Sequence, residues 1–448
     1  MTPPAARRVR ALSIHAGYQC RHTGACCSSG WDIPVEREMP LRNALASGRL
    51  RIPEAAITSI LAESGAVSCF RAVPGLPHGA KVVLSSDSSG RCIFLDADRR
   101  CAIHRQLGPE ALPSACRDFP RVVTLTPLGV SITLSHYCPT AAAMLFVTPS
   151  DPRPVTLSDP RPVTPSDPRR PGREGSAIDI VENPPGFPPS WPYEGLAASD
   201  ALPPLLRPGV LMDWPSFERW EEFAMSVLGD ERRTPEAALD VLAAAAEDAR
   251  QWTPGDGPFA KYFRRLLSSR GAPSASGDQE STGPSFRGAA SASGDEESTC
   301  GSFARRRLPD ALGTTEAWRL VADCTPHRSL LSSAPDGLDD ADRRLVAPTW
   351  PSLARPIRNW LAAKAFASWL ALQGEGLRTT VLGVRLALGV LRAEAARGCA
   401  AAGRTLDAEL LREAVRRTDL VLVHLADPAA LARRLSRCEA PGPPAAAW

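Results

Sequence analysis

Two tandem repeats interrupt this chain of 448 residues and limit which parts of it can fold together. The first occupies residues 147–170 and reads VTPSDPRP, VTLSDPRP and VTPSDPRR in succession. The second occupies residues 270–303 and is a 17-residue unit, rich in Gly, Ser and Ala, that occurs twice. Neither repeat offers the apolar surface that a packed core requires, so both are expected to lie outside the folded parts.

The repeats predict five parts along the chain. Residues 147–208 hold 16 of the 44 prolines, which predicts an extended, disordered linker. A proline-rich ligand for another protein is the alternative for this segment. Residues 267–308 predict a second disordered insertion. The remaining parts are a cysteine-rich domain at 10–146, a helical segment at 209–266 and a helical domain at 309–438.

Apolar residues at helical spacing dominate the second half of the chain. Ser216 is placed to cap a helix with Phe217 and Trp220 on its apolar face, and Thr234 with Pro235 predicts the start of another. Further helices are expected around Ile357, at 377–402, at about 405–417 and at 427–437. His424 is expected to be a helix residue whose ring bonds a carbonyl.

The cysteine-rich domain has strand signals as well as short helices. Two β-hairpins are expected, one pairing 81–84 with 93–95 and one pairing 122–126 with 130–134. Short helices are expected at about 35–48, 54–63 and 103–107. The predicted fold class is therefore mainly α with small β-hairpins, in which an N-terminal cysteine-cluster metal domain precedes a helical C-terminal region.

Charge and hydropathy exclude several classes of protein. The formal net charge is +3, too small for a dedicated nucleic-acid binder. The N-terminal residues contain no apolar run of the kind found in secretory signals, and no stretch reaches the ~18 apolar residues that a membrane span needs. A cytoplasmic location without nucleic-acid or membrane partners is expected, where thiols stay reduced and clustered cysteines are more often metal ligands than disulfides.

Eight of the twelve cysteines fall within residues 20–138, and this density is the main functional signal. They are Cys20, Cys26, Cys27, Cys69, Cys92, Cys101, Cys116 and Cys138. Thiolates bind zinc in closed tetrahedral sites and hold iron–sulfur clusters through four ligands, so eight could build two sites. The neighbours Cys26 and Cys27 would more easily serve two metals, or a metal and the core, than share one. The spacing does not separate iron from zinc, and Cys69 lies in the least distinctive surroundings.

Four further residues are candidates for supporting such a site. His104 follows Cys101 by three residues, and His136 precedes Cys138 by two, so each could replace a thiolate or bond to a ligand. Arg117 and Arg121 belong to the CRDFPR segment at 116–121 and could bond the sulfurs or fix the loop. Cys324, Cys399 and Cys438 are expected to be structural, and Cys300 lies in a repeat.

These motifs carry a family resemblance. The segments YQCRHTGACCSSGWDIPVE at 18–36, CIFLDADRRCAIHRQLGPEALPSACRDFPR at 92–121 and SHYCP at 135–139 resemble the YkgJ-type cysteine-cluster family, described as a zinc- or iron-chelating domain. The resemblance covers about residues 10–146, and the helical end with TDLVLVHLAD is more loosely similar to longer family members. These include the FliB-like flagellin lysine methylases.

The resemblance implies a metal cluster held by the eight cysteines, and three functions stay open. The first is an iron–sulfur protein, with a [4Fe–4S] cluster or zinc bound through the N-terminal thiolates. The second is a FliB-like methylase that transfers methyl groups from S-adenosylmethionine to lysines of a protein such as flagellin. The third is a structural zinc protein whose helical half binds a partner. Catalytic residues stay unassigned, because no nucleophile elbow, phosphate loop or paired-carboxylate motif is present.

Overall fold

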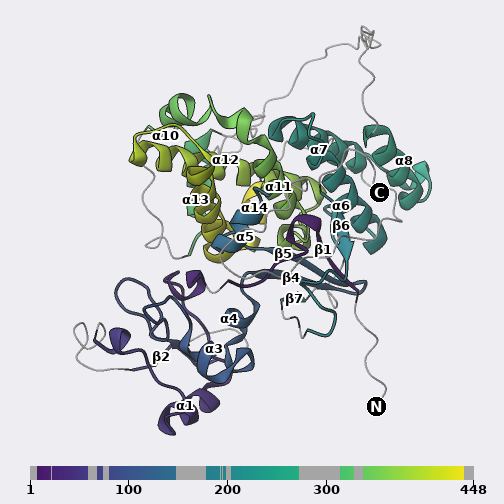
Figure 1. The fold of residues 1–448 in the computed structure, drawn as a ribbon. Helices are drawn as coiled ribbons and strands as arrows, with labels where there is room; N and C mark the ends of the chain where they lie inside the picture. Colours follow the sequence, from purple (N-terminus) through teal and green to yellow (C-terminus); the bar gives the residue numbers. More distant parts are fainter. Residues whose placement is uncertain are drawn as a thin grey trace, which may run out of the picture.

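The computed structural model describes most of the chain outside the two repeats. The described residues are 8–21, 23–58, 68–73, 80–147, 178–191, 193, 195–197, 203–271, 313–326 and 337–437. Both tandem repeats, apart from the residues at their starts, lie outside these ranges, so the disorder predicted for them falls on residues that are not described. Figure 1 shows a central sheet with helices on one side and the cysteine-rich region at lower left.

Among the described residues, five strands form one mixed sheet in the order β6-β1-β5-β4-β7. The strands are β1 (Val9–Leu12), β4 (Arg121–Thr126), β5 (Gly129–Leu134), β6 (Ile180–Glu182) and β7 (Leu196–Ala197). Strand β1 runs parallel to β5 and antiparallel to β6, while β4 is antiparallel to β5 and parallel to β7. The sheet is larger than the hairpins predicted from sequence, although the β4–β5 hairpin itself is confirmed.

Gly129 allows β1 to pair with the start of β5. Its φ is +140°, and a Cβ atom there would lie 2.4 Å from the carbonyl oxygen of Arg8. That carbonyl accepts a hydrogen bond from the amide of Val130 at 2.8 Å. A side chain at this position would therefore push β1 away from the hairpin.

The expected linker at 147–208 is wrong for its second part. Residues 180–182 form β6 and extend the sheet beyond β1, and Ser13 N–H donates to the carbonyl of Asp179 at 2.7 Å. Phe187 and Tyr193 are buried against the face of the sheet that carries Val9. The proline-rich composition predicted disorder in this segment. A strand of three residues is too short to give a sequence pattern that would have indicated otherwise.

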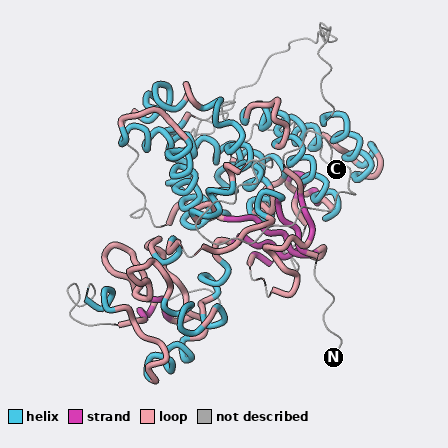
Figure 2. Tube along the Cα trace, in the orientation of Figure 1, coloured by secondary structure: helices cyan, strands magenta, loops and turns pink. Residues whose placement is uncertain are grey.

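The helical part packs on the other face of the sheet (Figures 1 and 2). Its helices are α5 (Pro139–Met144), α6 (Trp214–Leu228), α7 (Pro235–Arg250), α8 (Phe259–Gly271), α9 (Thr314–Asp323), α10 (Leu338–Ala341), α11 (Ala354–Ala365), α12 (Leu377–Ala402), α13 (Ala408–Asp419) and α14 (Pro428–Ser436). The long helix α12 contacts α7, α9, α11, α13 and α14. Two π-helical segments, Asp342–Val346 and Leu420–Leu425, follow α10 and α13 directly. The mainly α class is thus confirmed.

The helix ends show which capping predictions were right. Thr234 caps α7 as expected, accepting from the amide of Ala237. The cap of α6 is Asp213 instead of Ser216, since its carboxylate accepts the Ser216 amide at 2.7 Å. Helix α8 was not predicted and continues past residue 266 to Gly271, so the helical segment is longer than expected.

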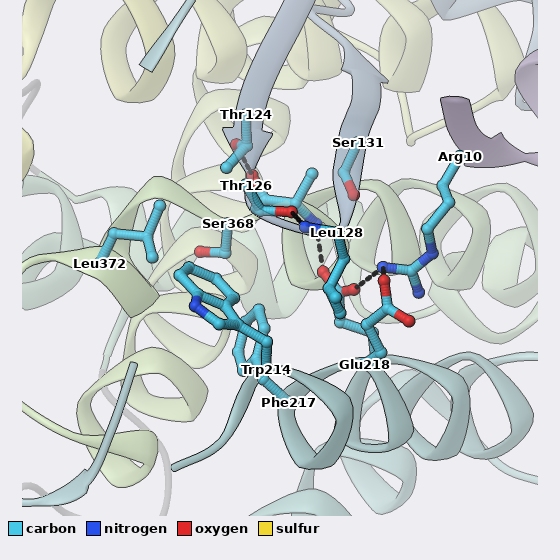
Figure 3. A pocket seen from close by; sticks show the side chains of 12 residues that line it. Arg10, Thr124, Thr126, Leu128, Ser131, Trp214, Phe217, Glu218, Ser368 and Leu372 are labelled. Carbon is cyan, nitrogen blue, oxygen red and sulfur yellow. Dashed lines mark hydrogen bonds and ion pairs between the residues drawn. The ribbon is translucent and has the colours of Figure 1, made fainter. Parts of the chain in front are cut away.

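A buried ion pair ties the sheet to α6 at the edge of a small pocket (Figure 3). Arg10, only 4% exposed, donates from Nη1 to Glu221 at 2.8 Å and lies 3.0 Å from Glu218. The other oxygen of Glu221 accepts the amide of Ala367, whose φ of +53° is unusual for a residue with a side chain. Burial raises the pKa of Glu221, against the pull of Arg10. Through these bonds Glu221 joins β1, α6 and the residues just after α11.

The cysteine-rich region is built mostly from loops (Figure 2). It contains α1 (Glu38–Ala46), β2 (Phe70–Ala72), β3 (Val82–Leu84), α3 (Ala102–Leu107) and α4 (Ser114–Asp118). The predicted pairing of 81–84 with 93–95 is wrong, because β3 pairs with β2. A bridge between Ser86 and Cys92 joins the residues next to the two expected strands. The helices expected near 35–48 and 103–107 are confirmed as α1 and α3, and the one expected at 54–63 begins at Glu54 but is described only to residue 58.

None of the helices in the described ranges combines the length and apolarity that crossing a bilayer requires.

Candidate metal centre

The loops that carry Cys27 and Cys92 touch directly. Cys27 closes the short 3-10 turn Ala25–Cys27, and its carbonyl accepts the amide of Cys92 at 2.7 Å. Both side chains are buried. Gly30 and Gly90 lie back to back, each with positive φ, so that a Cβ atom on Gly90 would come within 2.8 Å of the Gly30 Cα. The close approach of these two loops therefore depends on glycine.

Replacing Gly90 with alanine is expected to lower the free energy of unfolding by about 1–3 kcal/mol, since it adds both backbone strain and a clash. Urea unfolding measures the change. Gly48→Ala is the matched control: Gly48 also has positive φ (+73°), but a Cβ there meets no atom within 4 Å. Equal losses in the two variants would show that the contact between the loops does not matter.

Cys101 has the surroundings of a thiolate ligand. It is the residue just before α3, and its side chain makes no capping hydrogen bond there. The neighbouring Cys27 thiol, followed by the backbone N–H groups of His104 and Ile103, lowers the pKa of Cys101 to about 7 although burial opposes this. The structure therefore brings two predicted ligands, Cys27 and Cys101, into contact, with His104 supporting one through its backbone.

Cys20 and Cys138 lie near a different residue, Tyr18. The Tyr18 hydroxyl is 3.8 Å from the Cys138 sulfur, and both thiols act on the hydroxyl electrostatically. Burial, followed by these two neighbours, raises the pKa of Tyr18 well above its usual range. Cys138 is buried in the cluster formed by Tyr18 and the sheet, whereas Cys27 and Cys92 belong to the core of the cysteine-rich region.

The three remaining predicted ligands have different positions. Cys116 lies on α4 and packs against the core that contains Cys27. Cys69 packs against that core too, but burial raises the pKa of its thiol and Arg42 is the charged neighbour acting on it. The backbone of Cys26 lies in the same turn as Cys27, and its side chain lies outside the described part. No three ligand side chains at metal-binding distances occur among the described residues.

Arg117 and Arg121 hold the loop after α4 in different ways. Arg117 lies 3.7 Å from the carboxylate of Asp118. Arg121 packs among three aromatic rings, with its guanidinium carbon 5.4 Å from the ring centre of Trp191 and 5.8 Å from those of Tyr18 and Phe187. Tyr18 also contacts Cys138, so the ring of Tyr18 links Arg121 to this predicted ligand.

The ring of His136 faces the helical part, and a role for it beside the thiols stays a prediction. Its ring Nδ1 and its backbone N–H face the carboxylate of Asp419, at 3.1 and 2.6 Å, and its Nε2 lies 3.1 Å from Nε2 of His15. The ammonium of Lys364 and the indole N–H of Trp360 also donate to Asp419, at 2.8 and 3.0 Å. Both ring nitrogens of His136 therefore have a partner within hydrogen-bond distance.

The buried contacts among His15, His136, Asp419 and Lys364 determine which of these groups are charged. Burial alone would raise the pKa of Asp419, but Lys364 and His136 outweigh it and hold that pKa well below its usual range. Since Asp419 stays charged, His136 donates from Nδ1 and accepts at Nε2 from His15. Burial lowers the pKa of both histidines, so each is neutral.

The neutral histidines predict a loss of stability in mild acid. His15, His136 and His424 have pKa values below their ordinary 6.5, that of His424 at about 4 through burial. The unfolded chain therefore binds more protons than the folded one once the pH falls below about 6.5, and unfolding becomes easier. Urea midpoints at about pH 7.5 and about pH 5.5 measure this, and an unchanged midpoint would contradict it.

An aromatic cluster joins the cysteine-rich region to the helical part. Trp31, Phe119 and Tyr137 surround His424, whose Nε2 lies 2.7 Å from the hydroxyl of Ser135. His424 lies in the π-helical segment after α13, and its partner is this hydroxyl in place of the predicted carbonyl. Sequence reasoning missed this cluster and the Asp419 chain, because their members lie up to 404 residues apart and no local pattern links them.

Comparison with known proteins gives one partial similarity. Residues of this chain are 28% identical over 123 positions to the flagellar biosynthetic protein FliU of Salmonella muenchen. The aligned part is 28% of this chain and 66% of that protein, slightly less than two thirds of its length. No family model matches the chain, and no solved structure matches it.

Proposed function

We propose that the N-terminal region is a metal–thiolate centre that holds an iron–sulfur cluster. The observation that carries this proposal is that Cys27 and Cys92 lie in one buried cluster, against which Cys101 and Cys116 pack, with Cys101 next to Cys27. Backbone N–H groups near a thiolate stabilise it and tune the metal it binds. Cys92, held against Cys27 through the backbone, is the third ligand in this group.

The donor set fits a soft metal site. Thiolates select zinc and iron–sulfur clusters over hard cations. Cys20 and Cys138 meet at Tyr18, apart from the Cys27 group, which favours two groups of ligands. In that arrangement the neighbours Cys26 and Cys27 would serve one group each, and Cys116 would join one of them. A bound cluster would supply electron transfer or a rigid cross-link between the loops, and the thiols of this chain would position it.

Anaerobic purification of the full chain tests this proposal. Iron and acid-labile sulfide in comparable amounts, with broad visible absorption, are the expected result. A colourless protein with stoichiometric zinc would refute the iron–sulfur assignment and favour a structural zinc site, in which the helical half binds a partner protein.

A second proposal is methylation of protein lysines with S-adenosylmethionine as the methyl donor. It is supported by the partial similarity to a flagellar biosynthetic protein, which makes flagellin the first substrate to try. The test is transfer of labelled methyl groups from S-adenosylmethionine to flagellin by the metal-loaded protein. Absence of transfer to flagellin and to lysate protein would count against this activity without affecting the metal assignment.

A further inference from the structure

Three segments that carry proposed ligands each contain an aromatic residue, and the three aromatic rings pack around His424. Trp31 follows Cys27 by four residues, Phe119 follows Cys116 by three, and Tyr137 immediately precedes Cys138. Their ring centres lie 4.4, 5.9 and 6.2 Å from that of His424. The three rings also contact one another, at 5.4 to 6.4 Å.

The helical part holds His424 firmly in place. It lies in the π-helical segment Leu420–Leu425, which the amide of Ala426 closes by donating to the carbonyl of Val421 at 2.8 Å. That segment begins directly after Asp419, the carboxylate fixed by Lys364 and Trp360. On its other side, the ring of His424 meets the hydroxyl of Ser135 at the end of β5.

The contacts of His424 are with one hydroxyl group and with aromatic rings. Its Nε2 is engaged with Ser135, and carbon rings pack around it. Its ring packs against the aromatic side chains of three segments, each within four residues of a proposed ligand. Loops with little secondary structure of their own need such support to keep ligands in one geometry.

We infer that His424 is a positioning residue of the metal centre, through which the helical part keeps the Cys27, Cys116 and Cys138 loops in register. This inference rests on the proposed metal function. Residues that orient metal ligands typically change metal affinity by about 10–100-fold when removed. His424→Ala is therefore expected to release metal to a chromophoric chelator about 10–100-fold faster than the unaltered chain.

Two variants separate positioning from general loss of stability. His424→Phe keeps a ring among Trp31, Phe119 and Tyr137, and is expected to recover most of the slow release. Phe259→Ala removes a ring that stacks on Phe263 at 5.0 Å, away from the cysteines, and is expected to leave the release rate unchanged. Equal rates in His424→Ala and the unaltered chain would overturn the inference, as would equal acceleration by Phe259→Ala.

Amide hydrogen exchange in the metal-free full chain gives a readout that does not depend on metal. His424→Ala is expected to accelerate exchange in residues 28–31 and 117–119, and Phe259→Ala is not. If the purified chain holds no metal but this exchange pattern appears, the proposed function fails and the positioning of the loops stands. If metal is bound and the exchange pattern is absent, the inference fails and the proposed function stands.

Discussion

Replacing Asp419 with alanine is expected to lower the free energy of unfolding by about 3–5 kcal/mol, because it leaves a buried cation without its counter-charge. Asp419 is fully buried and accepts hydrogen bonds from Lys364, Trp360 and the backbone and ring of His136. These partners come from α11 and from the loop after β5, so one carboxylate joins the sheet to two helices. The loss should be among the largest that any single substitution produces here.

Urea unfolding of the full chain measures the change, with Asp240→Ala as the control. Asp240 pairs with Arg385 on the surface, where its side chain is 66% exposed, so its removal is expected to cost no more than about 0.5 kcal/mol. The double variant Asp419→Ala with Lys364→Met removes the stranded charge and should recover part of the loss. A loss under about 1 kcal/mol for Asp419→Ala would contradict the role given to this carboxylate.

Replacing Cys101 with alanine is expected to remove most of the metal from the purified protein. Cys101 lies next to Cys27 and packs against the core that contains Cys27 and Cys92, and its pKa is lowered to about 7, so a substitution there takes away the best-supported sulfur of the centre. Metal analysis and visible absorption of the anaerobically purified variant measure the loss. Secondary structure in the helical part, followed by circular dichroism, should stay close to that of the unaltered chain.

Cys399→Ala is the matched control for this experiment. Cys399 is also a buried thiol, but it lies on α12 in the helical core, and its pKa is raised by burial, whereas that of Cys101 is lowered by its neighbours. It is expected to keep the full metal content. Retention of metal by Cys101→Ala, or equal loss in both variants, would remove Cys101 from the ligand set.

Local sequence patterns predicted several helices in the second half of the chain. The bounds of α12 at 377–402 follow from its apolar spacing, and Thr234 and Asp427 cap the helices expected after them. The cap of α6 was misplaced because both Asp213 and Ser216 are good capping residues, and Pro215 at the second helical position favours the earlier one.

The central sheet could not be predicted in the same way, since its pairings are distant in sequence. Val9 pairs with Val130, and Leu12 pairs with Ile180, in strands of three to six residues. Arg10 in β1 also breaks the apolar pattern of a buried strand, because its partners on α6 are more than 200 residues away. Such contacts leave no signal in a single sequence.

The candidate site was only partly visible for a similar reason. The density of cysteines in the sequence indicated which part of the chain could bind metal. It did not indicate which thiols lie together, and the closeness of Cys27 and Cys101 is seen in the structure. His136 was predicted to support the metal site because it is close to Cys138 in sequence, whereas its ring faces Asp419 in the helical part. Residues 135–138 form a turn after β5 and not a strand, so residues close in sequence face different parts of the molecule there.

X-ray absorption at the edge of the bound metal tests the central claim, that these thiols hold a metal, most directly. The expected result is a first coordination shell dominated by sulfur, at about 2.3 Å for zinc and with additional iron neighbours for a cluster. The sulfur signal should fall in Cys101→Ala and stay in Cys399→Ala. A first shell of nitrogen and oxygen alone, or a chain purified anaerobically without metal, would contradict it.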